Sequence, residues 1–194
     1  MNFWLVVGLE TLAISVIGSL LHFTYAWSGK NKFVAIFSAV NESTWEHIKL
    51  ALSGSFCCML VDVWFLGDNP NYWIARSVSF VVPVLVIPAI FYTYTTWTKK
   101  PILPVDISSF VVAAFISSLV FAGILTLRPV GEMGGVVSMI ISMVVLAAYL
   151  LLTRFPLHMF LFRDPITGQY GYDGHSGHHY KRRRKVATKK TRKK

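Results

Sequence analysis

Long apolar blocks separated by short polar stretches make up most of the chain. The blocks cover residues 3–21, 45–67, 72–97, 106–127 and 133–153. Each is close to the about 20 residues that a helix needs to cross a bilayer. Backbone polar groups in the bilayer core must bond within the protein, which favours helices. The alternating pattern of membrane β-strands is missing from the sequence. We therefore predict an all-α membrane protein, a bundle of about five transmembrane helices.

The connection between the first two spans is longer than a simple turn. Residues 28–32 read Ser-Gly-Lys-Asn-Lys, a composition typical of turns. Residues 33–40 form an apolar patch that is too short to cross the bilayer. We expect this patch to form a short re-entrant or interfacial segment.

Composition and charge exclude an ordinary soluble domain and place the excess charge in one tail. Hydrophobic residues make up 54% of the 194 residues, charged residues only 14%, and the net charge is +10. Residues 181–194 hold ten Lys or Arg residues and no acid. Like charges repel, so we expect a disordered polybasic tail. Beside a membrane it would contact anionic lipid headgroups, which we favour over nucleic acid as its partner.

Basic residues in short loops also predict the orientation, because such loops usually face the cytoplasm. Alternating spans put Arg128 on one side of the membrane, where Arg76 also lies, just inside the start of the third span. The other side receives the tail together with Lys30, Lys32, Lys49, Lys99, Lys100, Arg154 and Arg163. We expect a multi-pass protein of the cell membrane with its N-terminus outside and its C-terminus in the cytoplasm. The predicted parts are a transmembrane domain (1–155), a cytoplasmic juxtamembrane segment (156–180) and the tail (181–194).

Residues 41–50, at the start of the second span, are unusually polar and read Asn-Glu-Ser-Thr-Trp-Glu-His-Ile-Lys-Leu. Ser43 followed by Glu46 fits a capping box, which satisfies two backbone N–H groups at a helix start. A capping box does not require Glu42 or His47. His22 ends the preceding span and can approach both of them across the hairpin.

Three kinds of site are compatible with these residues. In the first, His22, Glu46 and His47 hold a divalent metal ion with water at an open position. In the second, a carboxylate and a histidine act as acid and base without a metal. In the third, free N–H groups at the helix start bind an anionic lipid headgroup. The candidate catalytic residues are His22, Glu42, Glu46, His47 and Asp164, and the candidate anion contacts are Lys30, Lys32 and Lys49.

Three charged residues lie within the apolar spans at similar depth: Glu10, Asp62 and Arg76. Ionised groups in a membrane are costly unless they are paired. Asp62 and Arg76 flank one short hairpin, so a salt bridge between them is expected. Such a pair fixes helix register, and the alternative is a path for protons or cations.

Three motifs together resemble an uncharacterised family of small bacterial multispanning membrane proteins, a domain of unknown function. The motifs are His22-Phe23-x-Tyr25-x-x-Ser28-Gly29, Val40-Asn41-Glu42-Ser43-x-Trp45-Glu46-His47-x-Lys49 and Asp164-Pro165-x-Thr167-Gly168-x-Tyr170-Gly171. The resemblance covers residues 10–171 and leaves out the basic tail. It implies an architecture and the position of a site, and no particular chemistry.

The leading hypothesis is a polar site at the cytoplasmic membrane boundary that catalyses chemistry on a lipid-like or membrane-associated substrate. One alternative is a small-solute or ion transporter that uses Glu10, Asp62 and Arg76. Another is a non-catalytic membrane scaffold subunit. A separate His-rich stretch at residues 175–179 is expected to bind metal only adventitiously.

Overall fold

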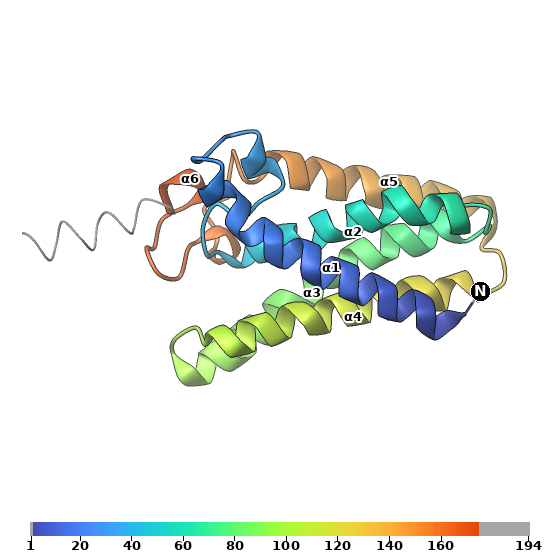
Figure 1. Ribbon diagram of the computed structural model, residues 1–194, viewed down its shortest axis with the longest axis horizontal. Helices are drawn as coiled ribbons and strands as arrows, with labels where there is room; N and C mark the ends of the chain where they lie inside the picture. The colour runs from blue at the N-terminus through green and yellow to red at the C-terminus, as the bar shows by residue number, and fades with distance from the viewer. Residues whose placement is uncertain (1, 175–194) are drawn as a thin grey trace, which may run out of the picture.

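Five long helices form the body of the computed structural model, which describes residues 2–174 (Figure 1). They are α1 (Phe3–Trp27), α2 (Thr44–Leu66), α3 (Tyr72–Thr98), α4 (Leu103–Leu125) and α5 (Gly131–Leu151). Each is long and apolar enough to cross a membrane. The described residues contain no strand, so the predicted all-α membrane fold is confirmed. The polybasic tail and the His-rich stretch lie outside the described residues.

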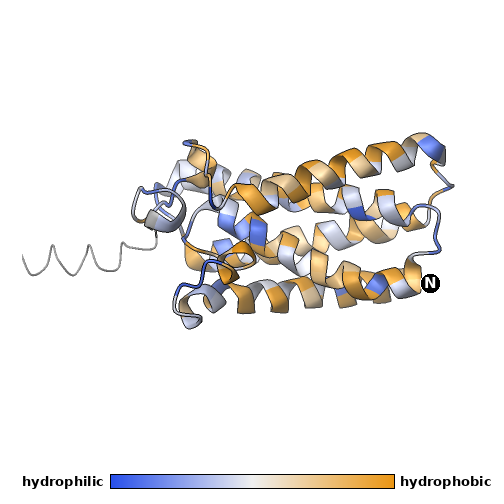
Figure 2. Ribbon diagram, turned by 90° about the horizontal axis from the view of Figure 1, so that it is seen from above, coloured by the Kyte–Doolittle hydropathy of each residue, from blue (hydrophilic) through white to orange (hydrophobic). Residues whose placement is uncertain are grey.

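Short elements gather at one end of the bundle, where α1 ends and α2 begins (Figure 1). They are the 3-10 helices η1 (Val34–Ile36) and η2 (Phe160–Phe162) and the one-turn helix α6 (Gly171–Gly174). The α3–α4 turn and the end of α5 lie at the same end (Figure 1). This end is the more hydrophilic one, whereas the middle of the bundle is largely apolar (Figure 2). We call it the loop-rich end.

Two glycines allow α1 to lie close against its neighbours. A Cβ atom at Gly54 of α2 would lie 2.9 Å from the Cα atom of Ile14 in α1. A Cβ atom at Gly18 of α1 would lie 2.4 Å from the Phe110 ring of α4. Small residues are the usual means of close helix packing in membranes, where the hydrophobic effect does not drive helices together.

Helix α5 is the least buried of the five helices and packs mainly against α3. Hydroxyl groups connect the two helices, because Ser77 Oγ lies 2.7 Å from Ser138 Oγ and 2.8 Å from Ser142 Oγ. Hydrogen bonds of this kind satisfy polar groups that have no water partner in lipid.

The charged residues within the spans form one connected network towards the other end of the bundle. Arg76 donates to both carboxylate oxygens of Glu10, at 2.6 and 3.2 Å, and also to Asp62. The Tyr72 hydroxyl donates to Asp62, and the Arg76 guanidinium lies 3.7 Å from the centre of the Phe121 ring. The predicted Asp62–Arg76 salt bridge is confirmed. Side chains of α1, α2, α3 and α4 meet here, so the network fixes the register of four helices.

Candidate functional site

Segments far apart in the sequence meet at the loop-rich end. Asn41 donates its side-chain N–H to the Gly171 carbonyl at 2.8 Å, and the Glu42 backbone N–H donates to Asp164 Oδ2 at 3.2 Å. Ser38 donates to the Leu21 carbonyl at 2.5 Å, which ties the segment that contains η1 to the end of α1. The prediction that the three polar clusters share one end of the bundle is confirmed by these contacts.

The predicted capping box at the start of α2 is wrong. Ser43 is the N-cap residue, but its side chain makes no capping hydrogen bond. Its backbone N–H donates to Asn41 Oδ1 at 2.8 Å, and the Glu46 carboxylate accepts from the Val40 N–H at 2.9 Å. Asn41 therefore takes the role that the capping box gives to Glu46, because the Glu46 carboxylate has a buried partner elsewhere.

That partner is Lys49, one helical turn further along α2. The Lys49 ammonium lies 2.6 Å from the Glu46 carboxylate, and both side chains are almost completely buried. Lys49 also donates to the Ala35 carbonyl and to Thr153 Oγ1, each at 2.8 Å. Thr153 Oγ1 in turn donates to Glu46 Oε1 at 3.2 Å. This network joins α2 to the loop before it and to the residues just after α5.

Two sequence predictions are corrected by this network. Lys49 does not contact an outside anion, because its ammonium is enclosed by protein oxygen atoms. Lys30 and Lys32 remain exposed in the loop after α1. Glu46 does not join His22 and His47, because its carboxylate is committed to Lys49 on the inner face of α2.

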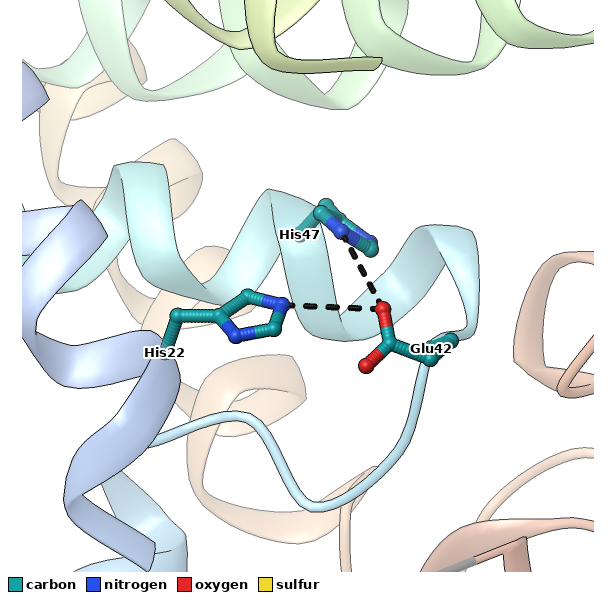
Figure 3. A group of neighbouring side chains, drawn as sticks. All are labelled: His22, Glu42 and His47. Atoms are coloured by element: carbon teal, nitrogen blue, oxygen red, sulfur yellow. Dashed lines mark ion pairs between the residues drawn. The ribbon is translucent and has the colours of Figure 1, made fainter. Parts of the chain in front are cut away.

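Glu42 takes the place predicted for Glu46. One ligand atom from each of His22, Glu42 and His47 lies within 4.8 Å of the other two (Figure 3). Glu42 Oε2 lies 3.6 Å from His22 Nε2 and 4.0 Å from His47 Nε2. All three side chains are partly exposed, so the cluster is open to a ligand from outside.

Helix geometry explains why the cluster forms. Successive residues of an α-helix are rotated by about 100°, so a buried Glu46 directs His47 to a different face of α2. His22 lies inside α1, because this helix continues to Trp27 and does not end at the predicted residue 21. The two imidazole rings lie with their centres 5.6 Å apart across the hairpin, and Glu42 reaches them from the loop.

The hydrogen bond of His47 determines which of its ring nitrogens can bind a ligand. Nδ1 lies 3.0 Å from the Ser43 carbonyl oxygen, and a carbonyl oxygen only accepts. We therefore assign the proton of the neutral ring to Nδ1, which leaves a lone pair on Nε2. That lone pair and the Glu42 carboxylate are both acceptors and lie 4.0 Å apart, a separation that a metal ion, a proton or a water molecule can bridge. Metal-binding histidines are commonly held by their second nitrogen in this way.

Asp164 reaches the cluster through the backbone of Glu42. Its Oδ2 accepts from the Glu42 N–H, and its Oδ1 accepts from the N–H groups of Ile166 and Thr167 at 2.7 and 2.9 Å. The carboxylate is almost completely buried. Asp164 therefore holds the loop that carries Glu42 and is not one of the three clustered ligand groups.

Sequence reasoning did not single out Asp106, which lies near the cluster. Asp106, in the first turn of α4, interacts electrostatically with both His47 and Glu42. Tyr94 of α3 donates its hydroxyl to Asp106 Oδ1 at 2.5 Å and so holds that carboxylate. The sequence did contain a hint. Alternating spans place the start of the fourth span, where Asp106 lies, at the same end as the start of the second.

We predict that Glu46→Gln strongly destabilises the protein and that Glu42→Gln does not. Removing one partner of a buried ion pair costs about 3–5 kcal/mol, because the other charge stays buried. Glu42 is half-exposed, so Glu42→Gln should lower the free energy of unfolding by much less than that amount. Unfolding of both variants by denaturant in detergent micelles measures the difference. Equal stability of the two variants would contradict this account of Glu46.

Comparison with known proteins identifies the family. Searches of curated proteins and of solved structures gave no match to this chain. A family model described as "Family of unknown function (DUF6512)" matches residues 1–172, which include the five helices, the cluster and the Asp164 turn. The chain therefore belongs to this family of unknown function, DUF6512.

Proposed function

We propose that the chain is a metal-dependent membrane enzyme in which His22, Glu42 and His47 bind one divalent ion. The observation that carries this proposal is the convergence of two imidazole nitrogens and one carboxylate oxygen within 4.8 Å. The proposal is strengthened by His47, whose Nε2 lone pair is left facing the carboxylate.

The ligand types and their spacing favour zinc. Two histidines and one glutamate form the three-ligand set of several catalytic zinc sites, which keep a fourth position for water or substrate. With bonds of about 2.0–2.1 Å, tetrahedral ligand atoms lie about 3.3 Å apart. The separations of 3.6 and 4.0 Å here are close to that value. All three ligand atoms lie within 4.8 Å of one another, so side-chain rotations that bring them together by at most about 1.5 Å would give the tetrahedral spacing.

The reaction that this site supports best is hydrolysis. A zinc ion with an open position lowers the pKa of bound water to about 7 and polarises a carbonyl or phosphoryl group. In this proposal Asp106 would accept the proton of that water, because it lies in the first turn of α4 within electrostatic range of His47 and Glu42 and is held by Tyr94. Asp164 positions Glu42 and does not touch the substrate.

The location of the cluster supports a lipid-like substrate. His22 lies in the last two turns of α1 and His47 in the first turn of α2, where two apolar spans end. The neighbouring side chains Phe23 and Trp27 are exposed on α1, as is typical of the headgroup region of a bilayer. An amphiphile held in the bilayer can present its headgroup at this depth.

The transporter alternative receives less support. It rests on Glu10, Asp62 and Arg76, and these residues bond to one another and to Tyr72. Charges that pair with one another in this way fix the positions of neighbouring helices. We therefore assign these charges to helix register.

We predict that the purified full-length chain retains one zinc ion per molecule. The test uses a background in which His175, His178 and His179 are replaced by Ala, and no polyhistidine tag, so that tail histidines contribute no metal. His22→Ala, His47→Ala and Glu42→Gln should each weaken zinc binding by more than the about 10- to 100-fold that losing a second-shell partner costs. Elemental analysis and competition with a chelator of known affinity provide the measurement.

His158→Ala is the matched control for zinc binding. His158 is exposed at the same end of the molecule and stacks on Tyr170, with ring centres 4.7 Å apart, outside the cluster. Its variant should bind zinc as the parent does. Zinc binding that is unchanged in all three cluster variants would overturn the proposed site, as would a parent protein that retains no zinc.

We propose further that the loop-rich end faces the cytoplasm. This end carries Lys30, Lys32, Lys99, Lys100, Arg154 and Arg163, whereas the turn between α4 and α5 carries Arg128. An excess of basic residues in short loops favours the cytoplasmic side.

Cysteine labelling on intact cells tests the orientation. In a background with Cys57 and Cys58 replaced by Ser, a cysteine at position 128 should react with a membrane-impermeant maleimide. A cysteine at position 30 should react only after the membrane is permeabilised. The reverse pattern would show that the loop-rich end lies outside.

A further inference from the structure

A hollow of about 330 Å³ lies at the loop-rich end, between the last turns of α3 and the turn that follows η2. Its lining consists of Phe91, Thr95, Lys99, Lys100, Pro101 and Pro165. Its lining thus combines two lysines and a threonine with one aromatic residue and two prolines. None of these residues belongs to the cluster of His22, Glu42 and His47.

The two lysines are the cationic part of this lining. No described acidic residue forms an ion pair with Lys99 or Lys100. Both side chains are exposed, and Lys99 adopts a left-handed conformation with φ of 56° at the C-cap of α3. This conformation turns the chain sharply, so the two consecutive lysines lie at the rim of one hollow. An anionic ligand would supply the missing charge.

We propose that this hollow binds the headgroup of an anionic phospholipid. The lysine ammonium groups would contact the phosphate, and Phe91, Pro101 and Pro165 would contact the glycerol backbone and the first carbons of the acyl chains. This site is separate from the metal cluster and does not depend on metal binding.

The position of the hollow favours a lipid over a soluble phosphate. Helix α3 is apolar up to its last turns and ends at Thr98, so Lys99 and Lys100 lie where a membrane span meets the aqueous phase. Exposed Trp97 and Leu103 flank the two lysines. A free phosphate ion would gain nothing from Phe91, Pro101 and Pro165, whereas a lipid buries apolar surface against them.

Native mass spectrometry of the delipidated full chain in detergent tests the proposal. The probes are phosphatidylglycerol, phosphatidylcholine with the same acyl chains, and inorganic phosphate. Each basic residue near a membrane surface contributes about fivefold to the binding of anionic lipid. We therefore expect the K99Q/K100Q double variant to bind phosphatidylglycerol about 25-fold more weakly than the parent.

Two further variants separate a built site from general charge attraction. K30Q/K32Q removes two exposed lysines from the same end of the molecule, and the basic tail is present in every variant, so its contribution cancels. This control should lose clearly less phosphatidylglycerol binding than K99Q/K100Q, because Lys30 and Lys32 do not line the hollow. Thr95→Trp keeps all charges but fills the hollow, and it should weaken phosphatidylglycerol binding as strongly as the loss of the two lysines.

Three outcomes would overturn the proposal. In the first, K30Q/K32Q and K99Q/K100Q lose phosphatidylglycerol binding equally, which indicates unspecific charge attraction. In the second, phosphatidylcholine binds the parent as tightly as phosphatidylglycerol does. In the third, inorganic phosphate at the concentration of the lipid displaces it, which identifies a soluble anion as the ligand.

Discussion

The buried ion pair between Glu46 and Lys49 is the interaction on which the candidate site depends. Two charges on adjacent turns of one helix are removed from water and satisfied by each other, by the Thr153 hydroxyl and by the Ala35 carbonyl. A buried charge without a partner is very costly, so the face of α2 that carries Glu46 and Lys49 must point into the bundle, towards their partners. The loop before α2 and the residues after α5 are thereby held against it.

The buried ion pair also determines which way the other side chains in the first turn of α2 face. With Glu46 facing inwards, His47 faces α1 and meets His22, and the carboxylate of Glu42 closes the cluster from the loop. The second buried network, between Glu10, Asp62 and Arg76, fixes the register of α1 and α3 towards the opposite end. Two buried polar networks in an apolar bundle therefore hold the partly exposed side chains of His22, Glu42 and His47 together at the loop-rich end.

Hydropathy was sufficient to predict the five spans, because a helix is the form that satisfies the backbone in lipid. Alternation of the spans was sufficient to bring His22, residues 41–50 and Asp164 to one end. The choice between Glu42 and Glu46 could not be made from spacing. It depends on hydrogen bonds from Lys49 to Ala35 in η1 and to Thr153 just after α5. The sequence pattern gave no sign that these residues would enclose the Lys49 ammonium. The same tertiary contacts replaced the expected capping box by the Asn41 bond.

X-ray absorption spectroscopy of the zinc-loaded full chain, with the tail histidines replaced by Ala, tests the central claim most directly. If His22, Glu42 and His47 bind the ion, the spectrum should contain four nitrogen or oxygen ligands at about 2.0–2.1 Å and the outer-shell scattering of two imidazole rings. That outer-shell signal should fall by half in His47→Ala. A first shell without imidazole scattering would contradict the account, because the ion would then be held by groups other than these histidines.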